Sequence, residues 1–491
     1  MKGSDSGLKT GLTFDDVLLV PKYSDIRSRK DADTATKFSR RIKLAIPLVS
    51  ANMDTVTEAG MAIAMAREGG IGVIHRFLPL EVQVSEVVKV KRSEGVVIED
   101  PITMGPDHTV REAWDVIREH DIGGIVIVDS GKKVLGLVTT RDIALEDNLD
   151  LKLRDAMTPR KELVTAPRGV TLAAAQAILH ENKVEKLPLL DRDGRLVGLI
   201  TSKDILKRRR YPSATKDGKG RLRVGAAIGV KGDYMERAEK LVEAGADALV
   251  VDIAHGHSSH AIDTLKNVKK ELGDVEVVAG NVATARGTVD LIKAGADAVK
   301  VGVGSGSICV TRVVTGFGIP QLTAIIESAG AARDYGVPVI GDGGVRFPGD
   351  VTKAIAAGAS TVMIGSLFAG TEESPGPTIL RDGVRYKLTR GMASLAATID
   401  RKIREGDRKR PNGDELLEEL VRESVPEGVE GLIPYKGKAY EVVKQLVGGL
   451  RSGMSYCGAR TLADLQKNAE FVRITPAGHK ESHPHDIEKV V

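Results

Sequence analysis

The stretch LVEAGADALVVDIAHGHS (residues 241–258) holds one complete structural unit. It begins as the end of a helical pattern, passes through Ala-Gly-Ala, and continues as the apolar run ALVV before Asp252. An apolar run without alternation is typical of a parallel strand that is covered on both faces. A glycine directly after a helix is suited to cap its C-terminus. The stretch therefore predicts a helix followed by a buried parallel strand.

Apolar runs of this kind, bounded by Gly or Asp, recur through the chain. They are IPLVSANMD (46–54), GIGVIHR (70–76), VGAAIGV (224–230), ALVVDIAHGHS (248–258), VEVVAGNV (275–282), AVKVGVG (298–304), PVIGDGG (338–344) and TVMIGS (361–366). Helical patterns lie between most of them, and three end in Ala-Gly-Ala, at Gly245, Gly295 and Gly358. Eight strands with intervening helices predict a (β/α)8 barrel. A doubly wound open sheet is the alternative, which the count of eight and the chain length disfavour.

The series of strands is interrupted over residues 94–212, where the sequence repeats itself. VLGLVTTRDI (134–143) matches LVGLITSKDI (196–205), and TVREA (109–113) matches TLAAA (171–175), each at an offset of 62 residues. Structureless loops of such length are rare, so we expect an inserted pair of small α/β modules. The barrel is then divided into residues 1–93 and 213–491. Its second part includes a charged excursion at 400–424, which predicts a mobile flap or a solvated linker, and a C-terminal segment.

Composition excludes several classes of protein. Hydrophobic residues make up 42% and charged residues 28% of the 491 residues, which is typical of a globular protein. A net charge of +4 is too small to indicate a specific nucleic-acid partner, and no apolar run is long enough to span a membrane. Two cysteines exclude a disulfide framework and suit a reducing compartment. We therefore expect a cytoplasmic protein with no membrane partner and no specific nucleic-acid partner.

One of the two cysteines lies in the glycine-rich stretch GVGSGSICVTR (302–312). At the end of the sixth predicted strand, Cys309 is expected at the mouth of the barrel, where chemistry gathers in this fold. Arg312 is close enough in sequence to favour a nucleophilic thiolate. A small buried hydrophobe is the alternative interpretation of Cys309. Cys457, in MSYCGAR, has no comparable setting and is interpreted as structural.

Other strand ends predict a phosphorylated ligand. GDGG (341–344) and IGS (364–366) follow the seventh and eighth strands, and their bare backbone amides together with Ser366 suit an anion. Asp252 suits ribose hydroxyls or an amide, and Asn281 offers an amide to a ligand, although a lone Asn in a turn is more often structural. His255 and His257 lack the carboxylate neighbours of a transition-metal site. No GxGxxG begins a βαβ unit, so a nicotinamide cofactor would have to lie across the barrel mouth.

In combination, these motifs resemble the family of IMP dehydrogenase and GMP reductase. The resemblance runs from LTFDDVLLVP (12–21) to ESHPHDI (481–487) and includes GSICVTR, GDGGVR, GSLFAGTEESPG, RGMAS and VPEGVEGLIPYKG. It implies NAD-dependent oxidation of IMP to XMP through a covalent thioimidate on Cys309, in guanine nucleotide biosynthesis. The inserted pair is similar to tandem CBS repeats (a Bateman module). In such repeats Asp142 and Asp204 would contact the ribose of an adenine or guanine nucleotide.

The resemblance also implies a role for individual residues. The implied catalytic residues are Cys309, Thr311, Glu427 and, in the flap, Arg401. The implied substrate-binding residues are Ser307, Gly344, Gly365 and Ser366 for the phosphate, Asp342 for the ribose, and Met392, Ala393 and Glu427 for the base. The implied NAD-binding residues are Asp252, Asn281, Gly302 and Gly304. The carbonyl groups of Gly304, Gly306 and Cys309 would bind a potassium ion, and the protein would be a homotetramer.

Several residues depart from the family pattern, and two alternatives therefore stay open. Thr389 stands in place of a tyrosine and Ala393 in place of a glycine, while DRK (400–402) replaces the usual Arg-Tyr of the flap. GMP reductase, which converts GMP to IMP and ammonia with NADPH, needs no such flap and is the alternative enzyme. A nucleotide-sensing protein with an inactive barrel is the other alternative, and the presence of Cys309, Thr311 and Glu427 argues against it.

Overall fold

The computed structural model of the chain describes residues 8–94, 97–120, 122–395, 397–399 and 425–484. The chain forms two compact units. The first comprises Met1–Lys91, Ser213–Asp217 and Leu222–Val491, and the second comprises Arg92–Pro212 and Gly218–Arg221. In the part of the chain that is described, no helix has the length and apolar character needed to cross a membrane.

The first unit is built on a closed barrel of eight parallel strands, in the order β13-β14-β15-β16-β17-β18-β4-β5. The strands are β4 (Leu48–Ser50), β5 (Ile71–Ile74), β13 (Gly225–Ile228), β14 (Ala248–Asp252), β15 (Glu276–Val282), β16 (Ala298–Val301), β17 (Val339–Asp342) and β18 (Thr361–Ile364). Each lies within one of the eight apolar runs, and nearly all of their residues are buried. The predicted (β/α)8 barrel is therefore confirmed, and the open sheet is excluded.

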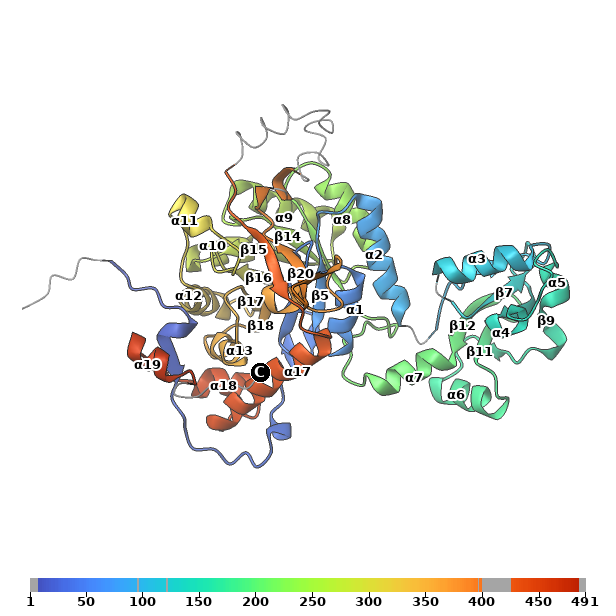
Figure 1. Cartoon of the computed structure of the whole chain (residues 1–491), viewed down its shortest axis with the longest axis horizontal. Helices are drawn as coiled ribbons and strands as arrows, with labels where there is room; N and C mark the ends of the chain where they lie inside the picture. The colour runs from blue at the N-terminus through green and yellow to red at the C-terminus, as the bar shows by residue number, and fades with distance from the viewer. Residues whose placement is uncertain (1–7, 95–96, 121, 396, 400–424, 485–491) are drawn as a thin grey trace, which may run out of the picture. The chain divides into compact units, whose positions relative to one another are not determined.

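Helices surround these strands (Figure 1). The helices of the first unit are α1 (Ala59–Arg67), α2 (Leu80–Ser93), α8 (Tyr234–Glu243), α9 (Ser259–Leu272), α10 (Ala285–Lys293), α11 (Thr311–Thr315), α12 (Gln321–Arg333), α13 (Pro348–Ala356), α14 (Ser366–Ala369), α17 (Ala439–Tyr456), α18 (Leu462–Asn468) and α19 (Pro476–Glu481), with 3-10 turns η1 (Phe14–Asp16) and η2 (Arg29–Asp31). The apolar faces of most of these helices pack on the barrel in one continuous hydrophobic core, to which α11, α19 and η2 contribute no residue.

Short antiparallel sheets complete the first unit. They pair β1 (Val17–Leu19) with β22 (Phe471–Arg473), β2 (Thr36–Lys37) with β3 (Lys43–Leu44), and β20 (Val384–Arg390) with both β19 (Thr378–Arg381) and β21 (Glu430–Pro434). In the last sheet Arg390 is paired with Glu430, so residues on either side of the 400–424 excursion are held together.

The Ala-Gly-Ala segments end helices α8, α10 and α13, as the sequence predicts. Gly245, Gly295 and Gly358 have φ angles of 97°, 108° and 109°, a left-handed conformation that favours glycine. After α8, the Gly245 N–H donates to the Val242 carbonyl and the Ala246 N–H to the Leu241 carbonyl, both at 2.9 Å. This pair of hydrogen bonds is the Schellman motif, and it turns the chain directly into the next strand.

Two of these segments continue with an aspartate that ties the start of a strand to a helix. The Asp247 carboxylate accepts hydrogen bonds from the Val224 N–H and from the Lys91 ammonium, both at 2.9 Å. Two strands further round the barrel, the Asp297 carboxylate accepts from the Val277 N–H and from Lys269, again at 2.9 Å. Burial raises the pKa of Asp247, and the nearby Lys91 ammonium opposes this effect.

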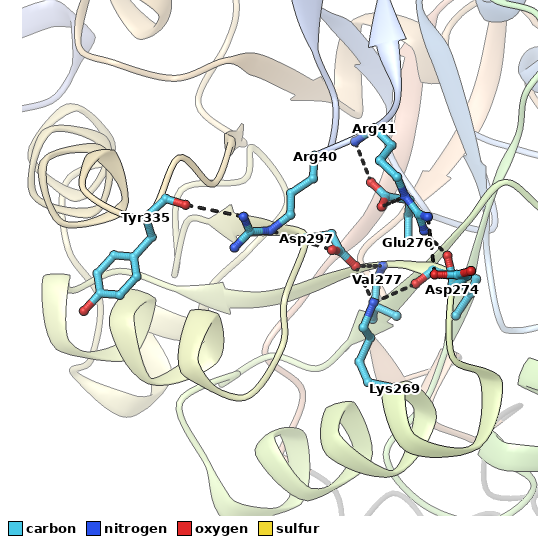
Figure 2. Close-up of polar contacts among 9 residues, drawn as sticks. Arg40, Arg41, Lys269, Asp274, Glu276, Val277, Asp297 and Tyr335 are labelled. Carbon is cyan, nitrogen blue, oxygen red and sulfur yellow. Dashed lines mark hydrogen bonds and ion pairs between the residues drawn. The ribbon is translucent and has the colours of Figure 1, made fainter.

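Figure 2 shows the contacts around Asp297 at the amino-terminal end of the barrel strands. The connection between β2 and β3 contributes Arg40, whose Nε lies 3.8 Å from Asp297 Oδ1, and Arg41, whose Nε donates to Glu276 Oε1 at 2.7 Å. These charges pair where strands β15 and β16 begin, so they close that end of the barrel with polar contacts.

The second unit has two similar halves. The first half contains β6 (Thr103–Met104), α3 (Val110–His120), β7 (Gly124–Val128), β8 (Val134–Thr139), α4 (Thr140–Ile143), α5 (Leu153–Ala156) and β9 (Thr158–Pro159), followed by the turn η3 (Arg160–Glu162). The second half contains β10 (Ala166–Pro167), α6 (Leu172–Glu181), β11 (Lys186–Leu190), β12 (Leu196–Thr201) and α7 (Ser202–Arg210). Apolar residues from both halves, including Val126 and Leu199, form a shared cluster.

We predict that Asp297→Ala destabilises the barrel, because it leaves the buried Val277 N–H and the Lys269 ammonium without this acceptor. The free energy of unfolding should fall by about 3 kcal/mol, measured as a lower unfolding temperature in calorimetry. Asp274→Ala is the control, since that fully exposed carboxylate also pairs with an arginine, Arg41, but should contribute little. Equal unfolding temperatures for the two variants would contradict the assigned role of Asp297.

Candidate active site at the carboxyl end of the barrel

The loop after β16 brings Cys309 to the mouth of the barrel. It leaves the strand through Gly302, whose φ angle is 151° and where an added Cβ would lie 2.1 Å from the Asp342 carbonyl oxygen. Only glycine allows the loop to pass so close to β17. Arg312 folds back on the loop and donates from Nη2 to the Ile319 carbonyl at 2.6 Å. Arg312 therefore holds the loop through backbone carbonyls, and the predicted help to the thiolate has no hydrogen bond to support it among the described residues.

The thiol of Cys309 begins a chain of hydrogen bonds. Cys309 Sγ donates to Thr311 Oγ1 at 3.2 Å, and Thr311 Oγ1 donates to Glu427 Oε2 at 2.7 Å. Thr311 is the first residue of α11, whereas Glu427 lies 116 positions later in the chain, just before β21. A carboxylate reached through one hydroxyl is an acceptor for the thiol proton, so the arrangement is able to generate a thiolate.

Backbone hydrogen bonds hold the two partners of this chain in place. The Val310 N–H donates to the Glu427 carbonyl at 2.9 Å, and the Val429 N–H donates to the Ile308 carbonyl at 3.0 Å. The Glu427 N–H in turn donates to the Ala393 carbonyl at 3.0 Å. The segment that carries Glu427 is thus bound on one side to the cysteine loop and on the other to the RGMAS segment.

Polar side chains from four neighbouring strands meet beside this loop. Asp252 ends β14, Asn281 lies in β15, Lys300 in β16, and Asp342 ends β17. Asn281 Nδ2 donates to the Gly302 carbonyl at 2.7 Å and to Asp342 Oδ2 at 2.9 Å. The structure therefore brings the predicted ligand-binding residues Asn281, Gly302 and Asp342 into direct contact.

Lys300 is the charged centre of this group, and the sequence analysis did not single it out. Its Nζ lies 2.9 Å from Asp342 Oδ2 and 3.6 Å from Asp252 Oδ1. Burial alone lowers the pKa of the ammonium, but Asp342 and Asp252 outweigh it, and the pKa is raised. The signal in the sequence was a single lysine in the otherwise apolar strand AVKV, where an unpaired charge would be costly.

The predicted phosphate-binding residues follow neighbouring strands at the same end. Gly343 and Gly344 come after β17, and Gly365 and Ser366 come after β18, which pairs with β17. Ser305, two residues before Ser307, donates from Oγ to the Asp342 carbonyl at 3.0 Å, so the cysteine loop adjoins the GDGG turn. Backbone amides and hydroxyls of three consecutive loops therefore lie around one edge of the mouth.

The RGMAS segment is anchored by residues that sequence reasoning missed. Arg390 Nε donates to Asp54 Oδ2 at 2.7 Å, and the Asp54 N–H donates to the Met392 sulfur at 3.4 Å. Asp54 follows β4 and has an almost fully buried side chain. An ion pair between an Asp and an Arg that are so distant in sequence leaves no local sequence pattern, so only the fold identifies it.

The remaining predicted residues differ in their surroundings. His257 Nε2 lies 2.8 Å from Asp290 Oδ2, and within the described ranges no three His, Cys, Asp or Glu side chains form a metal-binding group. Cys457 is buried at the end of α17, where burial raises the pKa of its thiol. Arg401 and the rest of DRK (400–402) lie outside the described residues.

Comparisons with known proteins give the family. A model of the IMP dehydrogenase / GMP reductase domain family matches residues 11–485. An inosine-5'-monophosphate dehydrogenase of Nitrosopumilus maritimus is 56% identical over 98% of this chain and 99% of the relative. An inosine-5'-monophosphate dehydrogenase of Aquifex aeolicus is 53% identical over 98% of this chain and 96% of the relative. The structure is also similar to a solved structure of GMP reductase from Trypanosoma brucei, a cysteine-to-alanine variant in complex with guanosine 5'-monophosphate. The two sequences are 43% identical, the TM-score is 0.92, and the match covers 99% of this chain and 100% of that chain.

We predict that Gly302→Ala displaces the cysteine loop, because the added methyl group would overlap the Asp342 carbonyl. The variant should lose about 2 kcal/mol or more of unfolding free energy, measured by thermal unfolding. Gly330→Ala is the matched control, since Gly330 is an exposed residue of α12 with open space around its Cβ position. It should gain about 0.5–1 kcal/mol, and a stable Gly302→Ala protein would contradict the close approach.

Proposed function

The chain belongs to the IMP dehydrogenase / GMP reductase family, and we propose that it oxidises IMP to XMP with NAD in guanine nucleotide biosynthesis. The observation that carries the proposal is the Cys309–Thr311–Glu427 chain of hydrogen bonds at the barrel mouth. The high identity to proteins named inosine-5'-monophosphate dehydrogenase, over nearly the whole of both chains, supports the choice of reaction.

In the first step, Cys309 acts as the nucleophile. Its proton moves to Thr311 Oγ1 as Thr311 passes its own proton to Glu427, and the thiolate sulfur bonds to C2 of the purine. The hydride that was on C2 leaves for the nicotinamide ring of NAD, which is thereby reduced. The purine is left as a thioimidate bound to Cys309.

In the second step, water adds to C2, its proton passes to a protein base, and the thiolate of Cys309 leaves, which releases XMP. Two bases are candidates in the proposal. One is Arg401, in the part of the chain outside the described residues. The other is the Thr311–Glu427 pair, once Glu427 has released to solvent the proton that it took up in the first step. The 2.7 Å hydrogen bond of this pair supports proton transfer at the edge of the purine.

IMP would lie across the mouth with its phosphate on the backbone and hydroxyl groups of Ser307, Gly344, Gly365 and Ser366. Its ribose hydroxyls would donate to Asp342. The base would lie along Met392 and Ala393, with Glu427 at its edge. Support comes from the Ala393–Glu427 backbone bond and the Ser305–Asp342 bond, which keep the three sets of residues adjacent.

NAD would contact Asp252, Asn281 and the Gly302–Gly304 backbone. Asp252 suits this role because its two oxygens each lie 3.6 Å from a cation, Lys300 or Arg76, and retain capacity to accept hydrogen bonds. Potassium would be held by the carbonyls of Gly304, Gly306 and Cys309, and it would supply a fixed charge that orders the loop. The Gly306 carbonyl accepts the Cys309 N–H at 3.1 Å and keeps a second lone pair for a hard cation.

Residues 94–212 are assigned in this proposal to a tandem CBS module that binds adenine or guanine nucleotides, between barrel parts 1–93 and 213–491. The Asp142 carboxylate accepts from the Thr139 N–H at 2.7 Å, and Asp204 accepts from Thr201 Oγ1 at 2.5 Å. These matching positions support two related subsites. A homotetramer in the cytoplasm completes the proposal, and the two free thiols suit that compartment.

GMP reductase is the second candidate, favoured by the similarity to the Trypanosoma brucei structures and by Thr389 and Ala393. The same thiolate would attack C2 of GMP, and the C2 amino group would take up a proton and leave as ammonia. Hydride from NADPH would then bond to C2 as the thiolate of Cys309 leaves, which would release IMP. The Cys309–Thr311–Glu427 chain of hydrogen bonds would serve either reaction, because both begin with attack of the thiolate on C2.

An absorbance assay at the NAD(P)H band distinguishes the two reactions. The purified protein with potassium should produce a rise in absorbance with IMP and NAD, and no fall with GMP and NADPH. A fall in the second mixture while the first stays constant would overturn the dehydrogenase assignment in favour of the reductase. No change in either, with a nucleotide still bound, would support the inactive barrel.

We predict that Cys309→Ala abolishes turnover, by at least about a thousandfold, while IMP binding stays measurable. Turnover is followed by absorbance and binding by calorimetry. Cys457→Ala is the matched control, because this buried cysteine has no contact with the site residues and its removal should leave the rate unchanged. Retained turnover in Cys309→Ala would show that the nucleophile is misassigned.

A further inference from the structure

Lys300 is a fully buried ammonium in a strand that is otherwise apolar. It lies in β16, and its side chain is 4% exposed. A buried lysine costs folding free energy unless it is paired, so its position calls for a compensating role. The proposed mechanism gives it none, since it is not among the residues that would contact IMP, NAD or the reacting atoms.

The charged and polar groups around Lys300 come from every strand packed against it and from one loop. Asp252 ends β14 and Asp342 ends β17, with Oδ atoms 3.6 and 2.9 Å from Nζ. Between them, Asn281 of β15 donates to the same Asp342 oxygen as Lys300. Arg76, after β5, lies 3.6 Å from the other oxygen of Asp252. One ammonium thus lies between two carboxylates, and a second cation, Arg76, lies beside Asp252.

The two carboxylates have different ligands in the proposed function. Asp342 would accept the ribose hydroxyls of IMP, and Asp252 would contact NAD. A carboxylate accepts the hydrogen bonds of a diol only where its oxygens lie within reach of both hydroxyl groups. Both ligands therefore depend on carboxylates that stay in place.

We propose that Lys300 is a positioning residue that holds Asp342 and Asp252 at a fixed separation, so that a single buried charge prepares the substrate and the cofactor subsites together. The inference rests on the proposed function. It assigns Lys300 no contact with either ligand and no part in proton transfer.

Removal of the ammonium has a defined electrostatic consequence. In Lys300→Met, a side chain of similar length replaces the charge, so the two carboxylates lose the ammonium that lies between them. Their mutual repulsion is then no longer opposed by Lys300, and neither carboxylate is held at the position that its ligand needs. Binding of both ligands therefore weakens.

The test compares KM for IMP, KM for NAD and kcat in the wild-type enzyme and in Lys300→Met. We expect both KM values to rise by about tenfold or more in the variant while kcat changes much less, because Lys300 is assigned no contact with the reacting atoms.

Lys91→Met is the matched control. Lys91 is also a buried lysine between two carboxylates, with Nζ 2.9 Å from Asp217 Oδ2 and 2.9 Å from Asp247 Oδ2. Asp247 directly precedes β14 and Asp252 ends it, so the control lies at the opposite end of the same strand. Lys91→Met should lower the unfolding temperature while both KM values stay close to those of the wild-type enzyme.

Each outcome is decisive. Unchanged KM values in Lys300→Met, or equal increases in Lys91→Met, would overturn the positioning role. If Lys300→Met does not fold, Lys300→Gln keeps a hydrogen-bond donor without the charge, and both of its KM values should rise in the same way. A wild-type enzyme that neither turns over nor binds IMP would overturn the proposed function and the inference with it.

Discussion

Parallel pairing of β5 with β13 is the constraint on which the rest of the structure depends. Val73 pairs with Gly225 and Ile74 with Ala226, which closes the ring although the second compact unit lies between them in sequence. Closure places the carboxyl ends of all eight strands at one edge. Residues that are far apart in the chain, such as Asp252 and Asp342, then converge there because each ends its own strand.

The barrel uses the same interaction, an ion pair between a lysine and an aspartate, at its two ends. At the amino-terminal end, Lys91 and Lys269 bind Asp247 and Asp297, and each aspartate also accepts the N–H of a residue at a strand start. Those contacts connect helix to strand and serve stability. At the carboxyl end, Lys300 binds the last residues of two strands, whose carboxylates would face the proposed ligands. The position along the strand decides which role the same chemistry has.

The Cys309–Thr311–Glu427 chain joins two segments that only the fold brings together. The cysteine loop follows β16, and Glu427 precedes β21, whose pairing with β20 anchors it. Backbone bonds between the two segments fix the side chains, so proton transfer does not depend on a chance encounter of flexible loops. Both candidate reactions start with the same thiolate, so residues beyond this chain of hydrogen bonds decide between oxidation of IMP and reduction of GMP.

The sequence by itself determined the barrel, the helix ends at Gly245, Gly295 and Gly358, and the place of Cys309, because periodicity and left-handed glycines are local properties. The repeat at an offset of 62 residues likewise predicted the two similar halves of the second unit. Only the tertiary structure decided that Lys300 lies between two carboxylates and that Arg312 binds loop carbonyls. Electrostatic partners are chosen by distance in space, and a linear sequence does not record which strand ends become neighbours when the barrel closes.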